Sequence, residues 1–469
     1  MRALQLLAAF TLISFLAACG GGGGSSPVLP GEAQHPAPSP SVGAPAPAPS
    51  PTGPSSPSPS PAATATSAAT NNSSARIPST VGRVGLVQVF DYHDGYMPNS
   101  VISKSGRRYD AVWASLSPGG WDAAHPGMVV SNYYIMGLDQ YAALHHTLAW
   151  WKSTHPDWIL YACTASGAPT HDIAYMIGLN APDVPIDIHN PNAVAYQVQA
   201  MAQFARGAGY NALAVDQVVY WNIYQGGNSA FGQHRNATEY GCGTWHGSTF
   251  VRDYASAKDP QYASDVVAYV RQAHSILHNM GMALVINHPG GSPNDPNEQQ
   301  LLSNTDAVMD ETGFSDYGRY TQHPSIIGST LAWMRFAQSR GAAVMMVDKY
   351  LNFNEDVTGN AFEYALATYL LGNQGAALLF VGGVHGYGTL QYHNEYDAPI
   401  GKPCSDVSAG PVYVRRFSGG IAVVNASTSA LPLSLPSGKA YRDIEGHGVG
   451  STIPPITGYV LLTGANGCS

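Results

Sequence analysis

The chain has 469 residues, of which 45% are hydrophobic and 11% are charged, and its formal net charge is −9. The hydrophobic content is ordinary for a globular protein, whereas the charged fraction is far below the usual ~25%. Because no basic field is available to hold phosphates, we expect no nucleic-acid partner, and a neutral ligand suits the chain better than a polyanion.

The first segment is similar to a bacterial lipoprotein signal. Its charged start, Met1-Arg2, precedes an apolar run over residues 4–15 that is too short to span a bilayer, and Leu16-Ala17-Ala18-Cys19 follows. The rule for such signals implies cleavage before Cys19 and acylation of this residue, which would anchor the protein in a membrane. We therefore expect residues 1–18 to be the signal peptide. An ordinary secretory signal that contains a cysteine is the alternative.

Residues 19–76 are expected to form a lipid anchor followed by a disordered tether. Five glycines, 20–24, open a segment of Pro, Ala and Ser that lacks the apolar side chains needed to offset the entropy of ordering. Its proline part favours extended polyproline II at ~3.1 Å per residue, which suits a spacer. Position 20 is not the aspartate that retains lipoproteins in an inner membrane. We therefore expect a cell-envelope lipoprotein in an outer membrane, facing the periplasm or the cell surface.

Residues 77–405 alternate between apolar runs and helical patterns, which predicts an α/β fold. We expect strands at 84–90, 111–115, 129–135, 212–216, 283–287, 307–310, 343–348 and 377–381. We expect helices at 191–206, 261–280, 330–340 and 362–371. Each of these helices directly precedes a glycine, which is a stop signal. Strands that are apolar on both faces and alternate with helices indicate a parallel sheet, and eight of them match a (β/α)8 TIM barrel.

The last stretch, 406–469, is expected to be a small antiparallel β domain packed on the barrel. Its short strand-like runs are separated by Gly, Ser and Pro, with no helical pattern between them. These runs cover 412–417, 421–424, 431–435 and 459–462. A series of strands after an alternating region is typical of a separate β module.

Four cysteines remain if Cys19 carries the lipid: Cys163, Cys242, Cys404 and Cys468. An even set in an exported protein indicates disulfides, although free buried thiols are an alternative. Of the three possible pairings, Cys163 with Cys242 and Cys404 with Cys468 keeps each bridge inside one domain. Because no paired C-x-x-C occurs, we expect no zinc site among the cysteines.

Several polar residues fall at the carboxyl ends of the expected strands, where barrel active sites lie. They occur at 91–94, 216–217, 287–288, 310–312 and 348–350. A single acid at such a position is common as a cap for the next helix. Carboxylates at several strand ends of one sheet indicate a functional cluster, because charge beside an apolar core is costly.

Two carboxyl groups that flank one bond are what glycoside hydrolysis requires: one protonates the leaving oxygen, and the other attacks carbon or activates water. Asp216 and Glu311 are the expected pair, since their strands lie two apart and would face each other across a cleft. Asp310 points to the opposite face from Glu311, which lies nearer the loop. Asp348 is a third catalytic candidate, although a helix cap or a salt bridge would also explain it.

Further side chains near these strand ends are candidates for binding sugar. Aromatic rings suit the apolar faces of sugars, although each such residue alone is more often part of the core or a loop. The substrate-binding candidates are Asp91, His93, Trp113, Tyr134, Trp221, Asn287 and His288. Trp221 and Asn287 are the two we expect most. We expect no metal and no other cofactor.

Four stretches resemble barrel glycoside hydrolases of the hypothetical glycosyl hydrolase family 15 type: HPDWILY at 155–161, VPIDI at 184–188, GYNALAVD at 209–216 and MDETGF at 309–314. The resemblance covers most of residues 83–390 and implies a (β/α)8 fold and carbohydrate hydrolysis. The β tail is similar in position to the β domains that follow many amylase-like and α-galactosidase-like barrels. In the latter the nucleophile follows strand four and the acid follows strand six. By analogy Asp216 is the nucleophile and Glu311 the acid of a retaining mechanism.

The sequence therefore predicts a monomeric glycoside hydrolase that is held in the envelope through Cys19 and cleaves a polysaccharide or oligosaccharide. Two alternatives stay open. One is a carbohydrate-binding lipoprotein without catalysis. The other is a metal-dependent polysaccharide deacetylase, with Asp91, His93 and either His288 or His385 as ligands, although no closely spaced histidine pair lies at a strand end.

Overall fold

The computed structural model describes residues 77–93, 97–139, 146–176, 183–229, 232–234, 239–316, 318, 324–408, 410–464 and 466–468. The expected signal peptide, the expected lipidation site at Cys19 and the expected tether lie outside the described residues. Among the described helices, none is both long enough and apolar enough to cross a membrane.

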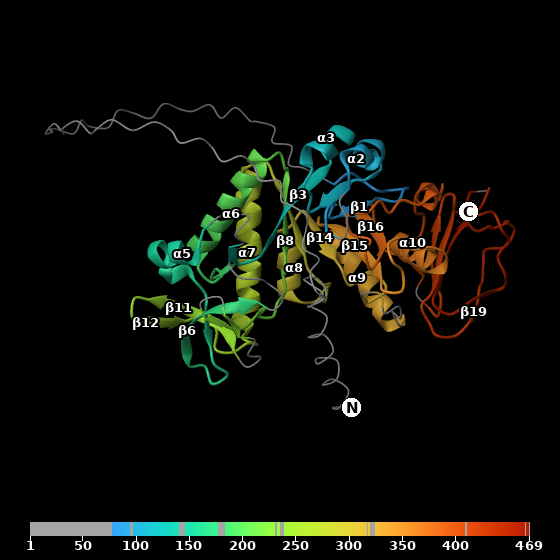
Figure 1. Ribbon diagram of the computed structural model, residues 1–469. Helices are drawn as coiled ribbons and strands as arrows, with labels where there is room; N and C mark the ends of the chain where they lie inside the picture. Colours follow the sequence, from blue (N-terminus) through green and yellow to red (C-terminus); the bar gives the residue numbers. More distant parts are fainter. Residues whose placement is uncertain are drawn as a thin grey trace, which may run out of the picture. The chain divides into compact units, whose positions relative to one another are not determined.

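An eight-stranded parallel sheet forms the centre of the fold, in the order β1-β2-β3-β8-β13-β14-β15-β16 (Figure 1). Its strands are β1 (Val87–Val89), β2 (Ala111–Trp113), β3 (Val129–Ile135), β8 (Ala212–Asp216), β13 (Ala283–Asn287), β14 (Ala307–Asp310), β15 (Ala343–Tyr350) and β16 (Ala377–Gly383). A parallel bridge between Leu86 and Leu379 brings the last strand back to the first. The TIM barrel is therefore confirmed, and β3, β8, β13 and β14 have the expected bounds.

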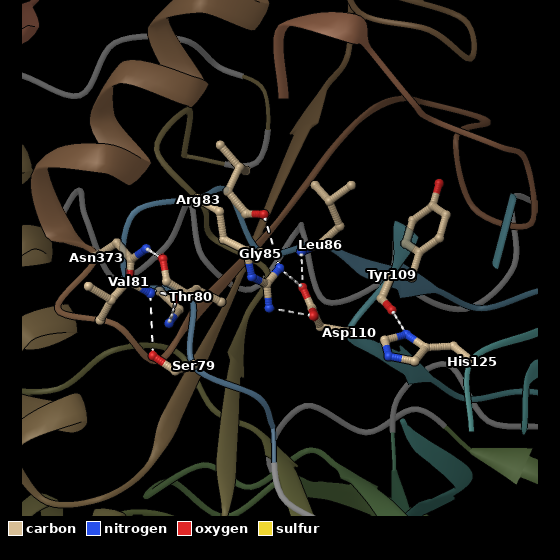
Figure 2. A network of polar contacts seen from close by, with 12 residues as sticks. Ser79, Thr80, Val81, Arg83, Gly85, Leu86, Tyr109, Asp110, His125 and Asn373 are labelled. Atoms are coloured by element: carbon tan, nitrogen blue, oxygen red, sulfur yellow. Dashed lines mark hydrogen bonds and ion pairs between the residues drawn. The ribbon is translucent and has the colours of Figure 1, made fainter. Parts of the chain in front are cut away.

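Polar contacts reinforce this closing seam at the amino-terminal end of the barrel (Figure 2). Asp110, directly before β2, accepts both Arg83 Nη1 at 2.8 Å and Arg83 Nη2 at 2.7 Å. The same carboxylate accepts the backbone N–H of Leu86 at 3.0 Å. Thr80 Oγ1 donates to Asn373 Oδ1 at 3.1 Å, which ties the first described segment to the turn before β16. At this end of the barrel, the charge of Asp110 is thus balanced by that of Arg83, and the neighbouring polar groups have hydrogen-bond partners.

Helices lie around the strands (Figure 1). They are α2 (Asn99–Ser105), α3 (Pro118–Ala124), α5 (Leu148–Thr154), α6 (Pro191–Gly207), α7 (Pro260–Asn279), α8 (Pro296–Leu302), α9 (Pro324–Ser339) and α10 (Asn360–Gly372). The starts of α6, α7 and α8 share one signature, a side-chain cap followed by proline at the first helical position. The four expected helices are confirmed, although α9 starts six residues before its expected position.

Alternate residues of the barrel strands face two different cores. One buried cluster contains no helix residue and therefore fills the barrel interior. Its members include Val89, Trp113, Val129, Ala212, Ala214, Ala283, Val285, Ala307, Met309, Ala343, Met345 and Val347. The residues between them, such as Leu213 and Leu284, pack against the helices. Along each strand, every second residue counted from a member of this cluster therefore faces the barrel interior.

Two loops, one after β3 and one after β8, together form a six-stranded antiparallel sheet. Its strand order is β10-β9-β6-β5-β11-β12. Its strands are β5 (Tyr161–Cys163), β6 (Pro169–Met176), β9 (Tyr224–Ser229), β10 (Gly232–His234), β11 (Tyr240–His246) and β12 (Thr249–Arg252). The Cys163–Cys242 disulfide joins β5 to β11 across the two loops. A smaller antiparallel pair, β4 (Leu138–Asp139) with β7 (Val184–Pro185), joins the beginning and the end of the loop that follows β3. No pattern recognised in the sequence predicts this sheet.

The carboxyl-terminal strands β17 (Tyr413–Phe417), β18 (Gly420–Asn425) and β21 (Thr457–Leu462) form the expected antiparallel sheet. Beside it lies the short pair β19 (Leu431–Pro432) and β20 (Thr452–Ile453). The sheet packs on α10 so closely that a Cβ at Gly458 would lie 2.6 Å from Tyr364 Cα. Cys404–Cys468 links its two ends. The domain boundary at residue 405 stays a prediction.

Candidate active site

Polar side chains continue the inward-facing rows at the carboxyl ends of five adjacent strands. Four of them lie two residues beyond a member of the interior cluster, and Tyr133 lies four beyond Val129 and packs against the same cluster, so each points into the mouth of the barrel. They are Tyr133 of β3, Asp216 of β8, Asn287 of β13, Glu311 after β14 and Lys349 of β15. Because the carboxyl ends of parallel strands share one edge, these five side chains converge.

Asn287 joins the two expected catalytic carboxylates. Its Nδ2 donates to Asp216 Oδ1 at 2.8 Å and to Glu311 Oε2 at 2.7 Å. The two oxygens therefore cannot be more than about 5.5 Å apart, which is these two distances laid end to end. The structure thus places Asp216, Glu311 and Asn287 together, as the sequence analysis expected.

Two tyrosines hold the outer oxygens of the same carboxylates. Tyr133 Oη donates to Asp216 Oδ2 at 2.6 Å, and Tyr387 Oη donates to Glu311 Oε1 at 2.7 Å. The backbone N–H of Gln217, a residue with φ of 61°, adds a bond of 2.7 Å to Asp216 Oδ1. Backbone in this region is costly for a side chain larger than glycine and is found preferentially at functional sites. Every oxygen of the pair thus accepts a hydrogen bond.

Burial sets the electrostatics of this pair. Asp216 is 7% exposed. Burial, and then the negative charge of Glu311, raises the pKa of Asp216, while the hydrogen bonds from Tyr133, Gln217 and Asn287 oppose that rise. The pKa of Tyr133 is also raised, first by burial and then by the charge of Asp216, so this phenol keeps its proton and remains a donor.

An aromatic wall adjoins the carboxylates. The Phe90 ring centroid lies 5.4 Å from that of Tyr387, 5.7 Å from that of Tyr133 and 5.1 Å from that of His93. Phe90 follows β1 directly and has φ of 50°. His93 was expected in the site and is placed there by this contact, whereas Phe90 was not expected. Aromatic side chains beside a polar pair suit a ligand with both apolar faces and hydroxyls.

Four exposed apolar side chains lie in loops at the same end of the barrel. Leu116, Trp221, Leu351 and Leu390 follow β2, β8, β15 and β16, and each is exposed. Trp221 was expected to bind substrate and is 37% exposed, which leaves its ring available.

Asp348 does not face the mouth, which corrects its expected catalytic role. It is fully buried, and its Oδ1 accepts the backbone N–H groups of Phe314 and Ser315, each at 2.9 Å, and Ser315 Oγ at 2.6 Å. The physical reason is the alternation of the strand, because Val347 and Lys349 face inward and Asp348 lies between them. Asp348 therefore shapes the loop after β14.

Tyr134 and His288 are likewise directed away from the mouth, contrary to expectation. Tyr134 is fully buried and shares a hydrogen bond of 2.7 Å with Tyr269 of α7. His288 Nε2 lies 2.9 Å from Glu298 Oε2, and both side chains are buried. Each residue follows an inward-facing neighbour, so its own side chain points toward the helices.

Asp91 and Trp113 are also buried rather than open to a ligand. Asp91 accepts Ser115 Oγ at 2.6 Å, the Leu116 backbone N–H at 2.8 Å and Trp121 Nε1 at 3.0 Å, so it fixes the loop after β2. Trp113 is 1% exposed and belongs to the interior cluster. The expected sugar contacts of these two residues are therefore corrected to structural roles.

Four residues of the mouth were missed: Tyr133, Lys349, Tyr387 and Phe90. The first two could have been found by counting alternate positions back to the alanines and valines of the interior. Tyr387, whose ring centroid lies 4.1 Å from Lys349 Nζ, comes from a loop after β16 that has no strand pattern to count from. No local signal of the sequence marks it.

Comparison with known proteins yields distant likenesses. No family model matches the chain, and no curated protein matches it. It is similar to an α-amylase from Anoxybacillus (10% identity, TM-score 0.46, covering 81% of this chain and 98% of that chain). It is also similar to a noncanonic maltogenic α-amylase from Thermotoga neapolitana (10% identity, TM-score 0.43, covering 81% of this chain and 98% of that chain). A third similar structure is a GH27 β-L-arabinopyranosidase from Geobacillus stearothermophilus (11% identity, TM-score 0.43, covering 81% of this chain and 96% of that chain). These neighbours are glycoside hydrolases, but identities this low transfer no activity to the chain. The family 15 resemblance stays a prediction.

Proposed function

We propose that the chain is a glycoside hydrolase that cleaves a polysaccharide or oligosaccharide with Asp216 and Glu311 and retains the anomeric configuration. The observation that carries the proposal is the shared Asn287 amide, which holds one oxygen of Asp216 and one oxygen of Glu311 within about 5.5 Å of each other. Retaining glycosidases place their carboxyl groups ~5–5.5 Å apart, whereas inverting enzymes need ~6.5–9.5 Å to admit a water.

Asp216 is the proposed nucleophile. Hydrogen bonds from Tyr133, Gln217 and Asn287 fix its carboxylate at the end of a strand. Its oxygen attacks the anomeric carbon as the bond to the leaving oxygen breaks, which forms a covalent glycosyl–enzyme ester.

Glu311 is the proposed acid and base. It begins the loop after β14 and is more exposed than Asp216, so it can meet both the leaving group and water. In the first step its proton passes to the leaving oxygen. In the second it removes a proton from the water that hydrolyses the ester, which restores both carboxyl groups.

The proposed substrate is a largely uncharged sugar chain. The aromatic wall and the exposed apolar loops offer surfaces for ring faces, and the low charge of the chain offers no field for a polyanion. We further propose an envelope location through lipidated Cys19, at an outer membrane, with the chain acting as a monomer. The two disulfides fit an exported protein.

The test begins with a screen of the purified full chain against bacterial exopolysaccharides, cell-wall glycans and dinitrophenyl glycosides. Glu311→Gln should lose activity toward polysaccharide but still release dinitrophenol from dinitrophenyl glycosides in a burst, because that leaving group needs no proton; hydrolysis of the ester should then be slow, because its base is missing. Asp216→Asn should lose both activities. Added azide should restore turnover in Asp216→Asn and yield a glycosyl azide of inverted configuration. Asp348→Asn, a buried carboxylate that faces away from the mouth, is the matched control and should behave as the parent protein.

Two results would contradict the proposal. A product of inverted configuration from the parent protein would exclude the retaining mechanism. Binding of a polysaccharide without release of reducing ends, in both the parent protein and Asp216→Asn, would identify a binding lipoprotein instead. The deacetylase alternative is not supported by the geometry, because Asp91 and His288 are each buried against their own partners.

A further inference from the structure

Two histidines and an aspartate meet at the amino-terminal end of the barrel, away from the carboxylate pair. His274 and His278 lie four residues apart on α7, so both project from one face of the helix. Asp306 directly precedes β14, whose other end leads to Glu311. The four residues of β14 separate the two acids, a span of roughly 16 Å from Asp306 to Glu311. This cluster is therefore a site of its own.

The spacing of the three side chains suits a metal ion. His278 Nε2 lies 3.0 Å from both Asp306 oxygens, and His274 Nε2 lies 4.0 Å from Asp306 Oδ2. The three candidate ligand atoms all lie within 4.8 Å of one another. Ligand atoms at ~2.0–2.1 Å from a tetrahedral zinc ion are about 3.3 Å apart, a value that the observed spacings bracket. Small side-chain rotations would thus complete the coordination.

The surroundings favour metal binding as well. The side chains of His274, His278 and Asp306 are 23%, 36% and 24% exposed, so an ion can enter from solvent and water can fill the remaining position. The backbone N–H of Leu284 donates to Asp306 Oδ2 at 2.8 Å and holds the carboxylate in place.

We propose that His274, His278 and Asp306 bind one divalent transition-metal ion, with zinc as the expected occupant, through both Nε2 atoms and the carboxylate. Two imidazoles and one carboxylate are ligands that zinc accepts, with water completing the tetrahedron. The ion would clamp the last turns of α7 to the segment before β14. Because the unfolded chain does not hold these ligands together, zinc would stabilise the folded protein. Cysteine spacing and strand ends gave no sign of this site, because its histidine pair lies on a helix.

The experiment measures zinc binding to the full chain, purified without a histidine tag and stripped with a chelator. Equilibrium dialysis near neutral pH should give one zinc ion per chain. His274→Gln and His278→Gln should each weaken binding by at least about tenfold. His447→Gln is the matched control, because His447 lies in the other histidine–carboxylate group of the described residues, with Asp443 and Glu445. It should bind zinc as the parent protein does.

Thermal unfolding separates a metal site from a merely structural ion pair. Zinc at about 100 times its Kd should raise the Tm of the parent protein by roughly 3 °C, and this rise should vanish in His274→Gln and His278→Gln. Cobalt should give visible ligand-field bands that these two substitutions remove. The proposal fails if zinc does not bind saturably, or if both variants bind it as tightly as the parent protein. It fails equally if His447→Gln is the variant that loses the ion.

Discussion

The two ends of the barrel use the same kinds of residue in opposite ways. At the amino-terminal end, Asp110 faces the guanidinium of Arg83, and its charge is balanced within hydrogen-bonding distance. At the carboxyl end, Asp216 faces a second carboxylate, Glu311, through a neutral amide. A paired charge stabilises the fold, whereas two like charges brought together cost stability. The difference indicates that the polar residues of the amino-terminal end stabilise the fold, whereas those of the carboxyl end form the candidate active site.

The largest expected effect comes from Asp216→Asn. If Asp216 is the nucleophile, kcat/KM should fall by on the order of 10⁴-fold. The Tm should stay the same or rise, because the folded state raises the pKa of this carboxyl and so disfavours its ionised form near neutral pH. Steady-state kinetics and calorimetry on one preparation test both. A large drop in Tm would make Asp216 a structural residue like Asp110.

Asn287→Ala should have the next largest effect. Removing the shared donor leaves Asp216 and Glu311 free to move apart, and we expect kcat/KM to fall by about 10²-fold. Asn211→Ala is a matched control, since Asn211 also bonds two partners but at the other end of β8. It should change stability and leave kcat/KM unchanged. Equal losses of kcat/KM in Asn287→Ala and Asn211→Ala would contradict the assignment of the active site to the carboxyl end of the barrel.

Asp110→Ala tests the balanced end. It leaves Arg83 and the Leu86 N–H without their acceptor, and we expect the free energy of unfolding to fall by about 2 kcal/mol, with kcat/KM intact. The loss should stay below that of a fully buried ion pair, because the Arg83 side chain is 42% exposed. Urea denaturation measures the change. A drop in kcat/KM at unchanged stability would contradict this assignment.

Tyr133→Phe should have the smallest effect and the clearest pH signature. Asp216 must be ionised to attack, so activity is lost as the pH falls through its pKa. Because that pKa is raised, the loss should occur above the ordinary range of an aspartate. The Tyr133 hydrogen bond lowers the pKa of Asp216, so its removal should move the acid limb of kcat/KM to higher pH and cost about tenfold in rate.

Tyr134→Phe is the control for that profile. The two tyrosines are adjacent, but Tyr134 bonds Tyr269 on the helix side of the sheet. Its replacement should leave the acid limb in place. A shift of the same size in both variants would show that the limb does not report the contact between Tyr133 and Asp216.

The barrel could be predicted from the sequence because its signals are local. Each strand is a short apolar run, and the helix starts and stops lie within a few residues of their own elements. The six-stranded sheet could not be predicted in this way. Its strands β5 and β11 come from loops whose cysteines are 79 residues apart; β5 is only three residues long, and β11 contains glycines and polar residues. Neither loop reveals its partner.

The candidate site likewise has features that local sequence signals predict and features that they do not. Residue order alone put Asp216, Asn287 and Glu311 at strand ends, and the period of two could have selected Tyr133 and Lys349 over Tyr134 and Asp348. Three features of the site depend on how eight strands close into a ring. They are the distance between the two carboxylates, the burial that raises the pKa of Asp216, and the contact of Tyr387 with Glu311. Local chemistry therefore determined which residues were available. Only the tertiary structure decided which of them meet, because distances between distant segments are set by packing and not by sequence spacing.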